Sequence, residues 1–134
     1  TTYKSLDLAD EMLEIAKQRK LEYNPTLQEG VQHEFIEGNV EDLTMIPDNS
    51  IDCYIAPLVL HLVESPDKML AEAKRVLKKG GVFGCSIWGS RDNSPYFTLL
   101  PDRFKEFGVE TSKQRSGFHL GDKDKLVGMA KEAG

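Results

Sequence analysis

Cysteine is scarce in this sequence, which contains only Cys53 and Cys85. Small domains stabilised by disulfides carry several cysteines at regular spacings, so two cysteines exclude a disulfide framework. Both cysteines lie inside apolar runs that have the composition of strands. We therefore expect two buried, reduced thiols.

Positive charge is not in excess either. The chain has 17 Lys and Arg against 22 Asp and Glu, a formal net charge of −5, and a pI near 5.2. Proteins that bind a phosphate backbone usually gather Lys and Arg on one face or at one end. Neither end of this chain concentrates basic residues, so we expect no nucleic-acid partner.

Long hydrophobic runs are also missing. The longest nearly uncharged run, residues 55–63, contains Pro57 and His61 and is too short to cross a bilayer. No basic start followed by an apolar stretch and a cleavage site is visible, so we expect no secretory signal. These absences predict a cytoplasmic protein without a membrane partner.

The composition that is present is that of one globular domain. The chain has 134 residues, of which 40% are hydrophobic and 29% are charged. It starts with Thr1 rather than Met, and it stops at Gly134 just where a helix would end. We expect residues 1–134 to form a single, partial domain that continues at both ends.

Strand-like and helix-like segments alternate along the chain. Helix starts are indicated by acidic residues at Asp10, by Ser-Pro pairs at Ser65 and Ser94, and by Asp122. The glycine pair 80–81 is typical of a helix end, which predicts a helix from Pro66 to Lys79. Strands are expected near residues 3–7, 33–37, 51–56 and 82–88. This order predicts an α/β fold, a Rossmann-like three-layer sheet of mostly parallel strands that is incomplete at both ends.

Ligands in open α/β sheets bind at the carboxyl ends of the strands. The candidates at those positions are Asp7, the corner formed by residues 38–41, and Ala56 with Pro57. An acidic residue that ends a strand can accept hydrogen bonds from both hydroxyls of a ribose. Asp7 could equally cap the helix that follows it, and the sequence leaves both interpretations open.

Four segments, taken in order, resemble the motifs of class I S-adenosylmethionine-dependent methyltransferases. They are residues 6–13 (LDLADEML), 38–43 (GNVEDL), 48–52 (DNSID, with LHLV at 60–63 beyond it) and 75–83 (RVLKKGGVF). The resemblance covers most of residues 3–90. It implies methyl transfer from S-adenosylmethionine to a small-molecule acceptor that the motifs do not specify.

The resemblance also implies roles for single residues. Asp7 would hold the ribose hydroxyls and Leu8 would pack on the adenine. Asn39 and the backbone of Val40 would contact the adenine edge, and the backbone of Ala56 would face the methionine amino group. The Asn39 carbonyl would accept from the adenine amine in place of the more frequent Asp.

One motif of the family is absent from this sequence. Its first strand and glycine-rich turn would precede Tyr3, and in the family that strand lies between the strands that here end at Asp7 and Ala56. We therefore expect either a gap in the sheet or a new strand pairing. The open strand edges would favour a homo-oligomer. We also expect this chain by itself to bind S-adenosylmethionine weakly or not at all.

His61 is the candidate catalytic residue, because a histidine beyond the fourth strand could act as a base. A packing or hydrogen-bonding role is the alternative. His33 and His119 lack the spacing of metal ligands, and we expect no metal site. Trp88, Tyr96 and Phe97 could line a substrate pocket or belong to the core.

Two functional hypotheses remain open at this point. The first is an S-adenosylmethionine-dependent methyltransferase. The second is a non-catalytic, methyltransferase-like module that pairs with another chain through its open sheet edge. A nicotinamide dehydrogenase is less consistent with the sequence, because no G-x-G-x-x-G segment follows a strand.

Overall fold

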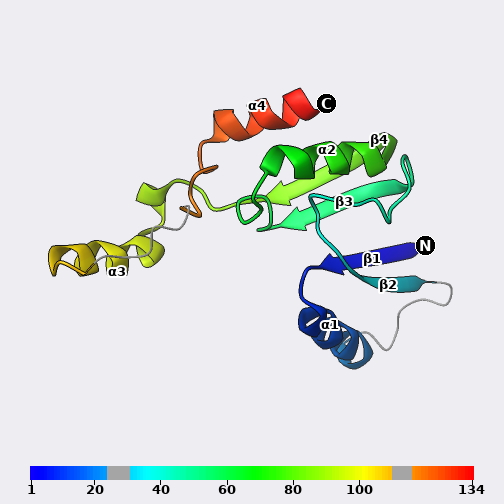
Figure 1. Ribbon diagram of the computed structural model, residues 1–134, viewed down its shortest axis with the longest axis horizontal. Coiled ribbons are helices and arrows are strands. Elements are labelled where there is room, and N and C mark those ends of the chain that lie inside the picture. The colour runs from blue at the N-terminus through cyan, green and yellow to red at the C-terminus, as the bar shows by residue number, and fades with distance from the viewer. Residues whose placement is uncertain (24–30, 110–115) are drawn as a thin grey trace.

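A computed structural model describes residues 1–23, 31–109 and 116–134. The alternation that the sequence predicts is present in it (Figure 1). In chain order the elements are β1 (Thr2–Asp7), α1 (Asp10–Tyr23), β2 (Gln32–Glu37), β3 (Ile51–Pro57), α2 (Pro66–Val76), β4 (Leu77–Ser86), the 3₁₀ turn η1 (Arg91–Asn93), α3 (Pro95–Glu106) and α4 (Lys123–Ala133).

The strands form two parallel pairs rather than one continuous sheet. β1 pairs with β2 from Thr2 opposite Gln32 to Asp7 opposite Glu37. β3 pairs with β4, and this ladder ends with Pro57 opposite Ser86. All four strands point the same way (Figure 1), but within the described residues no ladder joins β1 to β3. The α/β class is confirmed. Of the two alternatives left open by the sequence, a gap or a new strand pairing, the described residues have the gap, and the inner edges of β1 and β3 are both unpaired.

The boundary between α2 and β4 differs from the prediction. The helix ends at Val76 and the strand begins at once with Leu77, instead of a helix that continues to Lys79. Leu77 is already paired with Ile51, and the register shifts before Val82 pairs with Cys53. Gly80, at φ 82°, occupies this irregular stretch of the strand. The glycine pair therefore shapes a bulge within β4 and does not end the helix.

Helix capping follows the sequence in one of three cases. Asp122 accepts a hydrogen bond from the backbone nitrogen of Lys125 at 2.8 Å, as an N-cap does. Ser65 and Ser94 precede α2 and α3, but neither side chain makes a cap hydrogen bond. In both helices the proline after the serine occupies the first helical position, which its fixed φ favours.

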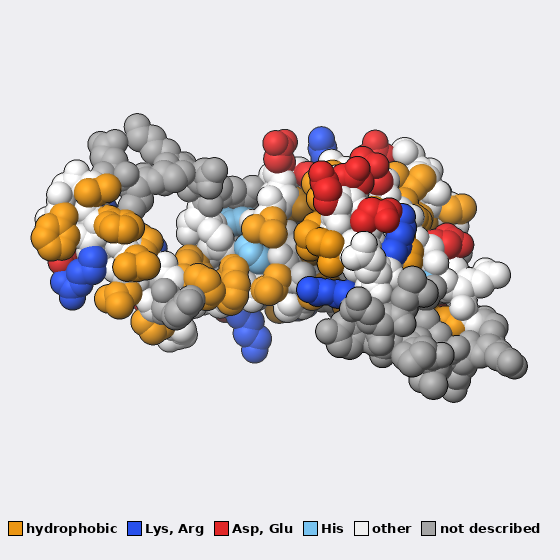
Figure 2. Space-filling model, turned by 90° about the horizontal axis from the view of Figure 1, so that it is seen from below, with side chains coloured by type: hydrophobic (Ala, Val, Ile, Leu, Met, Phe, Trp, Pro, Cys, Tyr) orange, Lys and Arg blue, Asp and Glu red, His pale blue; other side chains and the backbone are white. Residues whose placement is uncertain are grey.

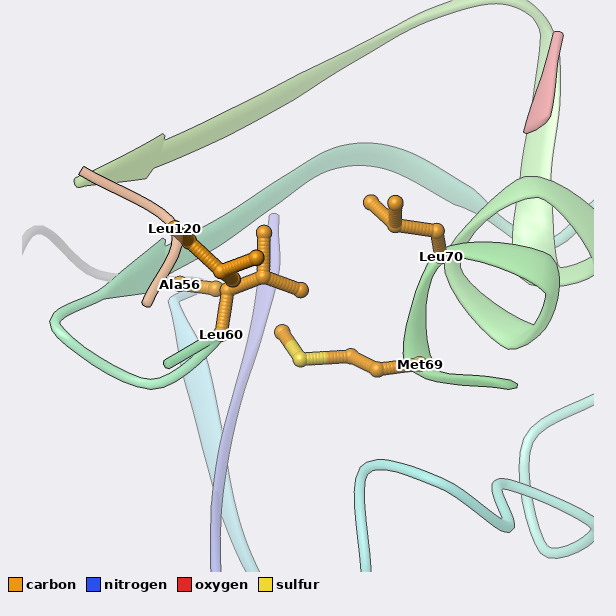
Figure 3. Packing of buried hydrophobic residues seen from close by; sticks show 5 residues of the cluster. All are labelled: Ala56, Leu60, Met69, Leu70 and Leu120. Carbon is orange, nitrogen blue, oxygen red and sulfur yellow. The ribbon is translucent and has the colours of Figure 1, made fainter. Parts of the chain in front are cut away.

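The main core cluster lies where β3, α2 and the segment before α4 meet. Figure 3 shows Ala56, Leu60 and Leu120 together, with the Met69 side chain extending toward them. Leu60 and Met69 are completely buried. Leu126, Met129 and Ala133 of α4 cover this cluster, while Ala130 on the same helix is exposed.

A second cluster holds the two strand pairs together. Leu43, Ile46 and Val76 are buried, and side chains from both strand pairs pack against them. Leu6 and Ile36 come from β1 and β2, and Ile51 and Tyr54 come from β3. The segment between β2 and β3 therefore bridges the gap in place of backbone pairing.

The periphery is more exposed than the sequence suggested. Cys53 is exposed and Cys85 half-buried, so the prediction of two buried thiols is wrong for Cys53, which lies on a strand with one unpaired edge. On α1, Leu13 is buried, whereas the adjacent Met12 is exposed.

Helix α3 extends away from the strands (Figure 1), and Figure 2 shows hydrophobic side chains gathered over this end of the molecule. Phe97, Leu99, Leu100 and Phe104 are all exposed there. None of the helices in the described ranges has the length and apolar character needed to cross a membrane.

The core cluster predicts a contrast between two methionines. Met69→Ala should lower the free energy of unfolding by about 2–5 kcal/mol, because it leaves a cavity in a fully buried site. Met12→Ala, at a position 53% exposed, should change it by less than about 0.5 kcal/mol. Urea unfolding followed by circular dichroism measures both, and equal effects would contradict this assignment of the core.

Candidate cofactor rim and the His61 site

Asp7 ends β1 and makes a local turn. Its Oδ1 accepts a hydrogen bond from the Ala9 backbone nitrogen at 2.9 Å, and its backbone carbonyl accepts one from Gly38 at 2.9 Å. The exposed carboxylate keeps its other oxygen without a partner among the described residues. Asp7 therefore stabilises the entry to α1 and still presents an acceptor, so the two interpretations of this residue are compatible. Leu8, 68% exposed beside it, presents an apolar surface at the same place.

Asn39 lies just beyond β2 in a tight turn. Its Oδ1 accepts from the Glu41 backbone nitrogen at 2.9 Å, and its backbone carbonyl accepts from Asp42 at 2.9 Å. The side-chain carbonyl of Asn39, which was expected to accept from an adenine amine, thus already accepts one hydrogen bond within the turn. The NH₂ group of the side chain remains as a donor. Val40 packs against the cluster that contains Ala56, so this turn lies against the end of β3.

The chain turns sharply after β3. Ala56 is buried, and Leu58 two residues later has a φ of 56°, which is uncommon for a residue with a branched side chain. Its backbone nitrogen donates to the Ser86 carbonyl at 2.9 Å. This strained turn leads the chain across the carboxyl end of the β3–β4 pair toward His61.

His61 is almost completely buried, at 5% exposure. Its ring meets Trp88 edge-on, with centroids 6.3 Å apart, and its Nδ1 has no hydrogen-bond partner among the residues described. Burial lowers the pKa of His61, and the nearby His119 lowers it further. A neutral imidazole with an unused nitrogen can accept or donate a proton, whereas a merely packed histidine usually has its nitrogens satisfied.

The other histidines and aromatics divide between two regions. His33 stacks on Phe35 with centroids 4.1 Å apart and shares a 2.8 Å hydrogen bond with Ser5, on the β1–β2 pair. Trp88 contacts both His61 and Phe97, the latter at 4.5 Å between centroids. The side chain of Tyr96 lies outside the described residues. In the described parts of the chain, no three His, Cys, Asp or Glu side chains come together as metal ligands.

Two other titratable groups near β3 and β4 are poor candidates for catalysis. Burial, helped by the charge of Glu72, raises the pKa of Tyr54 to about 12, so its phenol stays neutral. Burial also raises the pKa of the Cys85 thiol, which disfavours the reactive thiolate.

Arg75 begins the motif at residues 75–83, but the sequence did not predict the hydrogen bonds that this residue makes. Its guanidinium makes two 2.8 Å hydrogen bonds to the Glu72 carboxylate. It also donates to the carbonyls of Leu43 and Ile46, at 2.7 and 3.0 Å, and to Asp48. Glu72 in turn accepts from the Leu43 nitrogen at 2.7 Å. The only signal in the sequence was the three-residue spacing of Glu72 and Arg75 on one helix.

A hollow of about 290 Å³ lies at the other end of β4. Leu70, Lys74 and Leu77 line it together with Phe83 and residues of α4. It is remote from the carboxyl ends of the strands and contains none of the predicted site residues.

Comparison with known proteins agrees with this arrangement. The sequence profile of a family described as "Methyltransferase domain" matches residues 1–85. The chain belongs to this family. Members of this family use S-adenosylmethionine, and its site is expected at the edge where the strands end, which we call the rim. The Asp7 carboxylate, the apolar surface of Leu8 and the Asn39 amide lie at this rim. In their chemistry they fit the ribose and the adenine of the cofactor.

The relatives are larger than this chain. A 2-methoxy-6-polyprenyl-1,4-benzoquinol methylase of Schizosaccharomyces pombe, named as mitochondrial, is 42% identical over 79 residues, which are 59% of this chain and 25% of the relative. A ubiquinone/menaquinone biosynthesis C-methyltransferase of Rhodopseudomonas palustris is 40% identical over 98 residues, or 73% of this chain and 36% of the relative. The chain therefore spans about a quarter to a third of the curated relatives it matches.

The solved structures support the fold. An S-adenosylmethionine-dependent methyltransferase from Methanosarcina mazei superposes with a TM-score of 0.69 at 19% identity, covering 98% of this chain and 68% of that one. At this identity the likeness establishes the α/β methyltransferase fold of the domain.

The Glu72–Arg75 pair predicts a pH dependence. Hydrogen bonding to Arg75 holds the pKa of Glu72 below its ordinary value, so the stability it contributes is present above about pH 4.5 and is lost as the pH falls through the lowered pKa. Glu72→Gln should destabilise the domain by about 1 kcal/mol at pH 7, and the difference from wild type should shrink in acid.

Urea unfolding from pH 7 to pH 3 measures this effect. Glu132→Gln, at an exposed position on α4, is the control and should follow the wild type throughout. A Glu72→Gln difference that is the same at pH 7 and pH 3 would contradict the role assigned to the ionised pair.

Proposed function

We propose that this domain takes part in methyl transfer from S-adenosylmethionine to a small-molecule acceptor. The observation that carries the proposal is the common rim of the parallel strands, where Asp7, the Asn39–Val40 turn and the end of β3 at Ala56 follow one another. Parallel strands bring their carboxyl ends to one edge, which is where ligands bind in such sheets.

Each rim residue has a role in holding the cofactor. The free carboxylate oxygen of Asp7 accepts from the ribose hydroxyls, and exposed Leu8 packs on the adenine face. The Asn39 amide and the Val40 backbone contact the adenine edge, and the backbone at Ala56 faces the methionine end. The cofactor supplies a methyl group already activated on a positively charged sulfur.

The domain then needs only to orient the acceptor and exclude water. Methyl transfer from a sulfonium is a displacement that depends mainly on proximity and alignment, so no metal or protein nucleophile is required. His61, buried and neutral beyond β3, either serves as a base where the acceptor arrives protonated or orients the acceptor by donating a hydrogen bond.

The acceptor has an aromatic or otherwise apolar part in this proposal. Trp88 and Phe97 form an apolar path from His61 to α3, where further hydrophobic side chains are exposed. The names of the two curated relatives, which concern quinol and quinone biosynthesis, are in keeping with such an acceptor. A cytoplasmic location stays a prediction, since the name of one of these relatives says mitochondrial.

The open edges of β1 and β3 favour a second possibility, a non-catalytic module that pairs with another chain or with a copy of itself. Strand edges with unpaired backbone groups bind other strands readily. The two hypotheses differ in whether the Asp7 carboxylate matters for ligand binding.

Replacing the carboxylate at the rim tests the first hypothesis. In the full-length protein, Asp7→Ala should weaken S-adenosylmethionine binding about ten- to a hundredfold. The reason is that hydrogen bonds to a charged group, which contribute about 1.5–3 kcal/mol, would be lost. Glu37→Ala, at the partner position on β2, is the control and should leave the affinity within twofold. Isothermal calorimetry gives both values, and an unchanged affinity in Asp7→Ala would exclude the ribose role.

The open edges give a separate prediction for residues 1–134 alone. Light scattering after size exclusion should show self-association, and calorimetry should show S-adenosylmethionine binding that is weak or undetectable. The reason is that, in the described residues, β1 and β3 each keep an unpaired edge, and residues 1–134 contain no glycine-rich turn to receive the methionine end. Micromolar one-to-one binding by a strict monomer would contradict both parts.

A further inference from the structure

Two histidines far apart in the sequence present unused nitrogens at the same end of the β3–β4 pair. His61 Nδ1 and His119 Nε2 are both buried, and these are the two buried side-chain polar atoms that lack a hydrogen-bond partner among the described residues. A buried polar atom without a partner is destabilising, so two of them beyond the carboxyl ends of β3 and β4 call for an explanation.

The protonation of His119 is fixed by its own turn. Its Nδ1 lies 2.8 Å from the Ser116 carbonyl oxygen, which can only accept, so Nδ1 carries the proton. The neutral ring then has a lone pair on Nε2. His119 therefore has a buried hydrogen-bond acceptor at Nε2.

The segment that carries His119 is held firmly against the His61 side. Leu120 is buried in the main core cluster with Leu60. A Cβ on Gly121 would come within 2.3 Å of the Gly89 carbonyl oxygen, so only glycine permits this close approach of the two backbones. At Gly117 a Cβ would lie 3.7 Å from both the His61 and the Trp88 rings, which places the same segment directly over them.

We propose that His61 and His119 together form a recognition site for a hydroxyl group, in which the hydroxyl donates to His119 Nε2 and accepts from the Nδ1–H of His61. A hydroxyl is the smallest group that satisfies an acceptor and a donor at once. The edge of Trp88 beside His61 and its contact with Phe97 supply an apolar wall for a ring bearing that hydroxyl. This inference rests on the proposed function, to which it adds the polar group by which the acceptor is recognised.

Phenol and anisole distinguish this site from an apolar hollow, because anisole has the same ring without a hydroxyl proton to donate. With the ¹⁵N-labelled chain, imidazole nitrogen spectra should show His119 protonated on Nδ1. Phenol should shift His119 Nε2 and His61 Nδ1 in a saturable way, and anisole should bind about tenfold more weakly, the factor expected for one lost hydrogen bond.

The matched variants are His119→Gln and His33→Gln. The first should abolish the preference for phenol over anisole, and the second, at a histidine on the β1–β2 pair, should retain it. Should His119→Gln fail to fold, the comparison of the two probes on the wild type still decides. Gly121→Ala, which pushes the segment from Gly89 without removing the imidazole, should weaken phenol binding as well.

Equal binding of phenol and anisole, absence of phenol binding, or a preference that survives in His119→Gln would each overturn the proposal. A water molecule bridging the two nitrogens would then be the explanation. The measurement needs no S-adenosylmethionine, so its failure is independent of the Asp7→Ala test and leaves the proposed methyl transfer standing.

Discussion

The guanidinium of Arg75 is the interaction on which the arrangement of this domain depends. β1 and β3 do not pair, so the two strand pairs share no backbone ladder in the described residues. What joins them is the segment from Leu43 to Asp48, and Arg75 fixes both ends of that segment to α2 through carbonyl and carboxylate oxygens. A planar group with five donors can hold several acceptors in fixed directions, which a lysine could not do.

The consequences of this fixation reach the rim. With the segment held, Leu43, Ile46 and Val76 form a surface on which side chains of β1, β2 and β3 converge. The Asn39 turn immediately precedes this segment, and Glu41 extends it by accepting from the Ser65 nitrogen at the start of α2. The Asn39 turn and the end of β3 are thus positioned through one polar network, although β2 and β3 are not hydrogen-bonded to each other in the described residues.

Local signals in the sequence were sufficient for the elements and for the rim, and insufficient for what joins them. Alternation of strands and helices predicts parallel strands, and parallel strands of one sheet end at the same edge, which predicts Asp7 and Ala56 on one side of the fold. The end of α2 could not be predicted, because it is set by the pairing of Leu77 with Ile51 and not by the glycines that follow. The exposure of Cys53 likewise could not be predicted from the apolar run around it. His119 could not be linked to His61 at all, since their proximity results from the packing of Leu120 against Leu60.

The energetic costs in this structure are unevenly distributed, and their distribution points to the same end of the molecule as the motifs do. Leu58 has a positive φ, Gly121 approaches the Gly89 backbone closely, and two buried histidine nitrogens lack partners, all beyond the carboxyl ends of β3 and β4. At the amino end, the positive φ before β3 belongs to Asn49, a residue type that tolerates this conformation. Strain and unsatisfied polar atoms persist where the surrounding structure enforces them, and they concentrate at binding and catalytic sites. The strained and unsatisfied groups around His61 therefore lie at the same end of the strands as Asp7, which is the arrangement that the proposed site, aligning a cofactor and an acceptor, requires.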